Sequence, residues 1–190
     1  MKHLIVIAGP TGCGESSVTR GILEKLENSE RFITTTSREP RSGEKDGLDY
    51  NFISKEDFKQ KITENYFLEY SYIQNRDDYY GTPRHQIDEK IKQNKILIFN
   101  YDLVGAKAIK ENYPGETLSV FIAPESLEQI KTQLLNRNPG MPPEALEKRL
   151  KNAAEELKDQ GEYEHIIVNH YQLLKETIEN CYQLIIKELL

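Results

Sequence analysis

Short runs of apolar residues alternate along the chain with longer segments in which apolar and charged positions share a helical period. The apolar runs predict strands at 2–8, 31–35, 96–99, 117–122 and 165–168, and the alternating residues 66–73 predict another. The amphipathic segments predict helices at 17–26, 55–64, 84–94, 103–112, 126–136, 144–158 and 171–188. Buried strands that alternate with helices are typical of a parallel sheet with helices on both faces, so we expect an α/β fold.

One stretch, residues 37–83, interrupts this alternation. Residues 37–47 are polar with one proline and two glycines, and residues 77–83 are rich in turn-forming residues. Residues 138–143, Asn-Pro-Gly-Met-Pro-Pro, break the chain a second time, before the polar helix at 144–158. We expect a single domain, residues 1–190, with a small lobe at about 37–83 inserted into a core of about 1–36, 84–136 and 159–190.

The composition narrows the possible classes of protein. The chain of 190 residues has 37% hydrophobic and 29% charged residues, as expected for a soluble domain, and its net charge of −6 argues against a general nucleic-acid binder. No apolar run approaches the roughly 18 residues of a membrane span, and the N-terminus lacks the plan of a signal peptide. Cys13 and Cys181 are too few for a disulfide framework, so we expect a reduced, cytoplasmic protein without a membrane partner.

The residues between the first apolar run and the first helix carry the most specific chemical signal. They follow the phosphate-binding pattern G-x-x-x-x-G-K-[S/T] except at the lysine, where the chain has Glu15. The candidate phosphate-binding residues are Gly9, Pro10, Thr11, Gly12, Cys13, Gly14, Glu15, Ser16 and Ser17. Backbone N–H groups of such a loop surround phosphate oxygens, and the Ser16 hydroxyl suits Mg²⁺. An ordinary glycine turn between a strand and a helix is the alternative.

Two further clusters suggest recognition of an anion and of a base. Arg38 and Arg41, with Glu44 and Tyr50 close behind, can present two guanidinium groups to one phosphate, although surface arginines are usually only solvated. Glu69 interrupts an apolar and aromatic strand. Its carboxylate suits the N1–H and exocyclic amine of guanine, and a solvent-facing position is the alternative. The four histidines show no metal-ligand spacing.

These fragments together resemble the guanylate kinase family, and the resemblance runs through nearly the whole chain. The family's lobe has the pattern T-T-R-x-P-R-x-G-E-x-x-G-x-D-Y-x-F, and residues 35–52 read TTSREPRSGEKDGLDYNF, with Ser37 in place of one threonine. Further matches are Phe67-Leu68-Glu69, Tyr79-Tyr80-Gly81-Thr82, Asp102 with Gly105-Ala106, Arg149-Leu150 with Glu156, and Val168-Asn169. A thymidylate or adenylate kinase is a weaker interpretation, because Glu69 and the block from Arg38 to Tyr50 match the guanylate pattern.

The resemblance implies a role for each matching residue. The GMP phosphate would be held by Arg38, Arg41, Tyr50 and Tyr80, and guanine would be read by Thr34, Glu69, Thr82 and Asp102. Glu44 would orient the arginines or join the network of water around the metal. Arg137 and Arg149 would be catalytic arginines of a helical lid, about 137–158, that closes over the ATP phosphates. Asn169 would contact adenine.

The resemblance also implies the reaction, which is transfer of the γ-phosphoryl group of ATP to GMP with Mg²⁺. Three positions depart from the family pattern in charge: Glu15 replaces a lysine, Asn100 an acidic residue and Gln133 an arginine. The loss of cations near the phosphates predicts weak use of ATP, unless Glu15 turns outward or contacts the metal. The sequence thus leaves two hypotheses: a guanylate kinase, slowed by Glu15, or a catalytically impaired GMP-binding module that serves regulation or partner binding.

Overall fold

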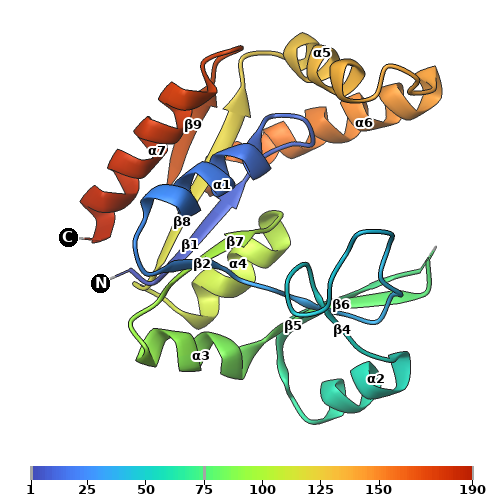
Figure 1. Ribbon diagram of the computed structural model, residues 1–190, viewed down its shortest axis with the longest axis vertical. Coiled ribbons are helices and arrows are strands. Elements are labelled where there is room, and N and C mark those ends of the chain that lie inside the picture. The colour runs from blue at the N-terminus through green and yellow to red at the C-terminus, as the bar shows by residue number, and fades with distance from the viewer. Residues whose placement is uncertain (1, 75, 190) are drawn as a thin grey trace.

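The computed structural model describes residues 2–74 and 76–189, which form a main sheet, a smaller second sheet and flanking helices (Figure 1). The main sheet has the strand order β2 (Ser29–Arg31), β7 (Ile96–Asn100), β1 (Leu4–Ala8), β8 (Thr117–Pro124) and β9 (His165–Asn169). Every pair of neighbouring strands in it is parallel. The α/β fold class with a parallel sheet is therefore confirmed.

Helices cover both faces of the main sheet, which explains why its central strands are apolar throughout. One face packs against α1 (Glu15–Lys25) and α7 (Leu174–Leu189), and the other packs against α3 (Arg84–Lys92), α4 (Leu103–Asn112) and the 3₁₀ helix η1 (Leu157–Glu162). Along β1, Leu4, Val6 and Ala8 pack into the core between the sheet and α3, α4 and η1. Ile5 and Ile7 pack into the core between the sheet and α1 and α7. The segment 9–14 between β1 and α1, which we call the phosphate loop, follows this fully buried strand. The first residue of the loop is therefore held in a fixed place.

The second sheet lies below the main one in Figure 1 and has the strand order β4 (Asn51–Phe52), β3 (Thr35–Thr36), β6 (Asp78–Pro83) and β5 (Phe67–Ile73). Helix α2 (Lys55–Thr63) packs on it through Phe58, whose ring stacks on Phe67 at 4.3 Å and on Tyr79 at 5.3 Å between centroids. The Ser54 side chain caps α2 by accepting from the Asp57 amide at 3.0 Å. This sheet contributes much of the wall of one cavity of the candidate site.

Helices α5 (Leu127–Arg137) and α6 (Pro143–Glu156) form a helical pair beside the carboxyl end of the main sheet (Figure 1). A small separate core of Ile130, Leu134 and Ala153 joins them. The rest of α6 is polar and mostly exposed, as its sequence predicts. None of the described helices is long and apolar enough to span a bilayer.

The structure corrects several predicted element bounds. The strand expected at 31–35 is wrong, because Arg31 ends β2 in the main sheet and Thr35 begins β3 in the second sheet. Phe32 lies between them and stacks on Phe99 at 4.8 Å, so a continuous run of β-forming residues spans two sheets. The turn-rich stretch 77–83 contains strand β6. The first helix begins two residues earlier than expected and the last begins later, at Leu174, while the helix expected at 144–158 is α6 followed by η1.

Candidate functional site

Three adjoining cavities follow the carboxyl end of the main sheet into the second sheet. The loop cavity, about 450 Å³, is lined by residues of the loop at 10–17 and by Gln133 and Arg137 of α5. The central cavity, about 420 Å³, is lined by Glu15, Asn100, Asp102, Glu156, Asp159 and Tyr163, among others. The lobe cavity, about 400 Å³, is lined by Thr34, Tyr50, Glu69, Tyr80, Tyr101 and Asp102, among others.

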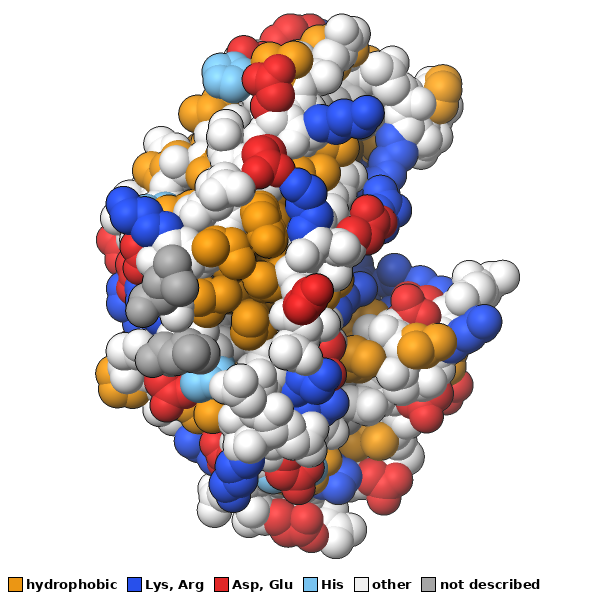
Figure 2. All heavy atoms as spheres, turned by 60° about the vertical axis from the view of Figure 1, so that its left-hand side comes forward, with side chains coloured by type: hydrophobic (Ala, Val, Ile, Leu, Met, Phe, Trp, Pro, Cys, Tyr) orange, Lys and Arg blue, Asp and Glu red, His pale blue; other side chains and the backbone are white. Residues whose placement is uncertain are grey.

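Shared residues make these cavities one continuous path. Thr11 and Glu15 line both the loop cavity and the central cavity. Asn100 and Asp102 line both the central cavity and the lobe cavity. The space-filling view shows a deep indentation between the part of the molecule that carries α5 and α6 and the part that carries the second sheet (Figure 2). A ligand that reaches from the loop to the second sheet can therefore lie along this path.

The loop cavity exposes the N-terminus of α1. Gly14 caps this helix with φ 96°, a left-handed conformation that favours glycine, and the Ser17 and Val18 amides both donate to its carbonyl. A Cβ on Gly14 would also lie 2.5 Å from the Asn169 amide nitrogen. The first N–H groups of an α-helix lack partners within the helix and attract anions. The backbone of the loop thus has the geometry that a phosphate site requires.

The predicted loop residues separate into those that line a cavity and one that does not. Pro10, Thr11, Gly12, Gly14, Glu15, Ser16 and Ser17 line the loop cavity, and Gly9 lines the central cavity. Cys13 is fully buried beneath the loop, where burial raises the pKa of its thiol to about 12. Cys13 and Cys181 are both buried free cysteines. Cys13 therefore supports the loop from inside as a neutral thiol.

Asn169 holds the loop in place and does not face the cavities. Its side chain is 3% exposed, its amide donates to the Cys13 carbonyl at 2.7 Å, and its Oδ1 accepts from the Thr177 hydroxyl at 2.8 Å. These contacts do not support the predicted adenine contact of this side chain, because both of its polar groups already have partners inside the protein. The hydrogen bonds of the Asn169 side chain therefore fix the conformation of the loop.

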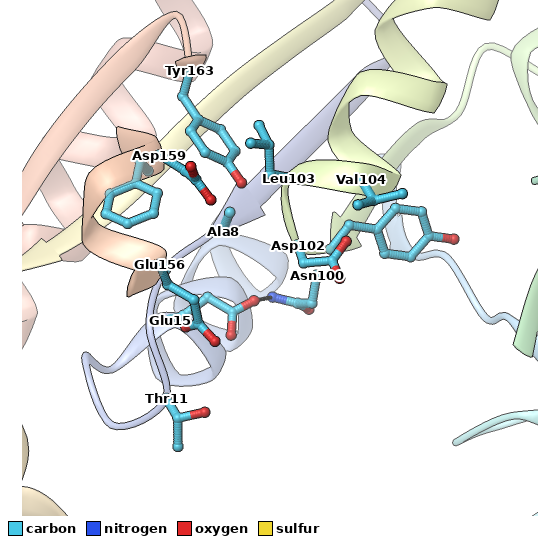
Figure 3. Close-up of a pocket in the computed structure, with 13 residues that line it drawn as sticks. Ala8, Thr11, Glu15, Asn100, Asp102, Leu103, Val104, Glu156, Asp159 and Tyr163 are labelled. Carbon is cyan, nitrogen blue, oxygen red and sulfur yellow. Dashed lines mark hydrogen bonds between the residues drawn. The ribbon is translucent and has the colours of Figure 1, made fainter. Parts of the chain in front are cut away.

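Glu15 does not turn outward. Its Oε1 accepts a hydrogen bond from the Asn100 amide, which lies 2.7 Å from the Thr19 hydroxyl as well, and Figure 3 shows this link at the wall of the central cavity. Burial raises the pKa of the Glu15 carboxyl, while the bond from Asn100 and the charge of Arg31 act against that rise. In the sequence, positions 15 and 100 are separate departures from the family pattern, and the structure brings them together.

The central cavity is acidic. Its charged lining residues are Glu15, Asp102, Glu156 and Asp159, and burial raises the pKa of Glu156. Figure 3 shows that Glu156, Asp159 and Tyr163 come from the end of α6 and the segment after it, opposite the strand ends. The sequence predicts no role for Asp159 or Tyr163, because neither belongs to a matched motif. Only the fold places them against the loop.

Arg38, a cation that is already paired, lines none of the three cavities but contacts Tyr50 and Tyr80, which line the lobe cavity. Arg38 is 8% exposed, its two terminal nitrogens donate to the two carboxylate oxygens of Glu44 at 2.6 and 2.8 Å, and its Nε donates to the Tyr80 hydroxyl at 3.1 Å. The guanidinium also lies over the Tyr50 ring, 5.1 Å from its centroid. The Glu44 carboxylate further accepts from the Arg41 amide at 2.8 Å. Of the two roles expected of Glu44, orientation of an arginine is the one these contacts support.

This pairing shifts both partners toward their charged forms. The hydrogen bonds from Arg38 and from the Arg41 backbone lower the pKa of the Glu44 carboxyl to about 2. The hydrogen bond to Glu44 likewise raises the pKa of Arg38. The Tyr80 hydroxyl accepts from Arg38, so its own hydrogen is free to be donated into the lobe cavity that Tyr80 lines. An anion in this cavity would meet a donor that is backed by a fixed positive charge.

Glu69 projects into the lobe cavity from β5 and is held there from behind. The buried Thr82 hydroxyl lies within hydrogen-bond distance of both the Glu69 carboxylate and, at 2.7 Å, the Tyr101 hydroxyl. Burial raises the pKa of Glu69. Thr82 therefore positions Glu69 and does not itself line the cavity. Tyr101 and Ser71 line the cavity but were not predicted, since their residue types give no signal that separates them from core positions.

The predicted arginines differ in where they lie. Arg137, at the end of α5, lines the loop cavity together with Gln133. Arg149 is exposed on α6 and lines none of the three cavities, so the structure does not bring it to the site. Arg41 is also exposed, and it meets the lobe through its backbone amide, which donates to Glu44.

The residues around the loop fit a metal that is bound mainly through phosphate oxygens. Ser16 is exposed on the wall of the loop cavity, where its hydroxyl is available as a ligand. Across the described ranges, no three His, Cys, Asp or Glu side chains converge to hold a metal by themselves. This pattern suits Mg²⁺, which keeps several waters and usually binds to a protein through one or two side chains and the phosphates of its nucleotide.

Known proteins resemble this chain over almost its whole length. Residues 1–188 match the guanylate kinase family. The chain is 39% identical over 167 residues to a guanylate kinase from Helicobacter pylori, covering 88% of this chain and 79% of that protein. It is 36% identical over 185 residues to one from Prochlorococcus marinus, covering 97% of each. The crystal structure of guanylate kinase from Anaplasma phagocytophilum superposes with a TM-score of 0.74 at 26% identity, covering 98% of this chain and 86% of that one. The chain belongs to the guanylate kinase family.

Proposed function

We propose that this protein binds GMP in the lobe cavity and ATP at the loop cavity, and transfers the γ-phosphoryl group of ATP to GMP. The observation that carries the proposal is the continuous path from the phosphate loop to the cavity in front of Arg38. Membership of the guanylate kinase family supports it. In-line transfer requires two nucleotides with their phosphates facing each other, and a continuous path of this kind would accommodate them.

On this proposal the lobe cavity holds GMP by complementary charge and hydrogen bonding. The GMP phosphate would lie toward Tyr80 and Arg38, and Arg41 would approach it from the surface. Thr34, Glu69 and Asp102 would face the guanine, with Glu69 accepting from its N1–H and amino group. Thr82 keeps the Glu69 carboxylate in position. This assignment predicts a strong preference for guanine over adenine, since adenine has no N1–H to donate.

At the loop cavity, backbone N–H groups of the loop would hold the β- and γ-phosphates of ATP, and Arg137 would approach them from α5. Ser16 would hold Mg²⁺, which supplies positive charge between the β- and γ-phosphates when it is bound. An oxygen of the GMP phosphate then attacks the γ-phosphorus, and the bond from that phosphorus to the ADP oxygen breaks. Arg149 would have to move toward the cavity to take part, because in this structure it lies outside it.

The charge of Glu15 is expected to slow this reaction. Two unit charges about 4 Å apart interact by roughly 4 kcal/mol at an effective dielectric near 20, and about 1.4 kcal/mol corresponds to tenfold in rate. A carboxylate where the phosphate pattern has a lysine removes an attraction and adds a repulsion. For this reason we keep a second candidate, a GMP-binding module with little turnover that acts in regulation or partner binding. The acidic central cavity favours it.

A coupled assay of GMP conversion to GDP separates the two candidates. We expect the native chain to convert GMP slowly with Mg·ATP and the Glu15→Lys variant to convert it at least about tenfold faster. Binding of GMP without turnover by either protein would favour the regulatory module. If the native chain neither binds GMP nor forms GDP, the proposed function is wrong.

A further inference from the structure

Asn100 uses both hydrogens of its amide to hold the start of α1. It lies at the carboxyl end of β7, in register with Ile7 of β1, so it faces the strand that leads into the phosphate loop. Its nitrogen donates to the Glu15 carboxylate and, at 2.7 Å, to the Thr19 hydroxyl. Glu15 and Thr19 are four residues apart and therefore share one face of the helix. Thr19 is 3% exposed, so this contact is sheltered from water.

The chemistry of this contact makes the residue at one position depend on the residue at the other. An amide can donate to a carboxylate, whereas an aspartate at position 100 would place two carboxylates in contact. A lysine at position 15 has the opposite requirement, because it donates and is best matched by an acidic residue at position 100. The two departures from the phosphate-site pattern, glutamate at 15 and asparagine at 100, are thus complementary to each other.

We propose that Glu15 and Asn100 act as a coupled pair that sets the affinity of the loop for the phosphates of ATP. Asn100 is a positioning residue: it holds the Glu15 carboxylate on the boundary between the loop cavity and the central cavity, both of which Glu15 lines. A variant that changes only Glu15 keeps Asn100, whose amide is suited to donate to a carboxylate at position 15. This inference rests on the proposed binding of ATP at the loop.

A double-mutant cycle in the affinity for Mg·ATP tests the pair. The proteins are the native chain, Glu15→Lys, Asn100→Asp and the double variant, each titrated calorimetrically with Mg·ATP and with GMP. We expect Asn100→Asp to weaken Mg·ATP binding beside Glu15 and to strengthen it beside a lysine at 15, with a coupling of at least about tenfold. The coupling between the two positions in GMP affinity should be smaller than that in Mg·ATP affinity, because Asn100 lines the lobe cavity and Glu15 does not. An equal effect of Asn100→Asp in both backgrounds would overturn the proposal.

Thermal stability measures the same coupling without any nucleotide, so a failure of the proposed function can be distinguished from a failure of the pair. Asn100→Asp should lower Tm by about 2–4 °C more beside Glu15 than beside Glu15→Gln, because only the first combination places two carboxylates in contact. An amide at position 15 can instead donate to the new carboxylate. Asn180→Asp makes the same charge change on the exposed face of α7 and should change Tm equally in both backgrounds. Equal losses for Asn100→Asp beside Glu15 and beside Glu15→Gln reject the pair.

If Asn100→Asp does not fold, truncation of both side chains gives an equivalent cycle. Asn100→Ala removes the donor, and we expect it to lower Tm more beside Glu15 than beside Glu15→Ala, since only the first combination leaves the carboxylate without its partner. Thr19→Val, which keeps the shape of the side chain and loses its hydroxyl, should have the smaller effect of the two single changes. Equal losses for Asn100→Ala in both backgrounds would contradict the coupling.

Discussion

The phosphate loop and the second sheet differ in the charged side chains that they place near a possible phosphate site. In the second sheet, Arg38 is fixed by Glu44 and Tyr80 before any ligand arrives, so positive charge stands ready behind the lobe cavity. At the loop, Gly14 and the start of α1 form the backbone geometry of an anion site, yet the side chain at the pattern's lysine position is a carboxylate. In one region an arginine is held in place by a carboxylate that balances its charge, and in the other the backbone geometry of an anion site carries a carboxylate of its own.

This contrast shows that the backbone and the charge of a phosphate site are separable. The conformation of the loop depends on glycines that tolerate positive φ and on Asn169, and none of these involves position 15. A glutamate there can change the affinity without changing the fold. The chain can therefore keep the architecture of its family while its use of ATP changes.

The largest expected effect lies on the GMP side. Arg38→Ala removes the buried cation and leaves the Glu44 carboxylate unpaired, so we expect the affinity for GMP to fall at least about thirtyfold. Calorimetric titration with GMP measures it. Arg41→Ala is the matched control: Arg41 is exposed, and its loss should cost less than a third of that factor. Equal losses of GMP affinity in the two variants would show that the pairing of Arg38 with Glu44 does not increase its contribution to GMP binding.

Asn169→Ala tests whether the loop geometry is built from inside. It removes a buried side chain that bonds the Cys13 carbonyl and the Thr177 hydroxyl, and we expect a loss of about 2 kcal/mol in the free energy of unfolding. Urea denaturation measures that loss. Asn136→Ala, on the exposed surface of α5, should lie within about 0.5 kcal/mol of the native protein. No change on Asn169→Ala would contradict a structural role for this side chain.

The Glu44 pair should appear in the acid stability of the protein. The pKa of Glu44 is about 2 in the folded state, below the roughly 4.3 of an unfolded chain, so the folded state binds fewer protons between these values. Its contribution is present above about pH 4.3 and is lost as the pH falls toward about 2. Melting curves should show native and Glu44→Gln proteins converging over this range. A constant difference between them would rule out the ion pair as its cause.

The Glu15 carboxyl should change the pH dependence of stability in the opposite direction. Burial raises its pKa, so the folded state binds more protons than the unfolded state between the unfolded and the raised values. The stability of the protein should therefore fall as the pH rises through that interval, and Glu15→Gln should remove this part of the slope. Comparison of Tm from pH 4 to pH 8 measures it. A steeper slope in the variant would contradict a raised pKa of the Glu15 carboxyl.

The sequence was sufficient for the elements whose patterns are local. Apolar runs predicted four of the five strands of the main sheet, all except β2, and the glycines of the loop predicted a turn between β1 and α1 that has the backbone geometry of an anion site. The block from Arg38 to Tyr50 predicted a cluster that the structure brings together with Tyr80. It was not sufficient at Arg31–Thr35, where one run of β-forming residues divides between two sheets, because no local signal marks a change of sheet.

The sequence mainly failed to predict which side chains contact each other across the fold. Position 15 and position 100 are far apart in sequence, and only the parallel pairing of β1 with β7 places them together. Asn169 has a side chain that suits ligand contact and structural bonding equally. Its burial and internal hydrogen bonds support the structural role, and its adenine contact stays a prediction. Asp159 and Tyr163 line the central cavity because of how the helix pair packs, which no motif indicates. The contacts that the sequence missed share one cause, which is that side-chain partners depend on tertiary packing.

The contrast between the two phosphate regions is tested most directly by the affinities of the native chain for GMP and for Mg·ATP, measured by calorimetry at one pH and one ionic strength. We predict measurable binding of GMP and binding of Mg·ATP that is at least about tenfold weaker, because the loop has a carboxylate at position 15 where the phosphate pattern has a lysine. Binding of Mg·ATP as tight as that of GMP would contradict this prediction.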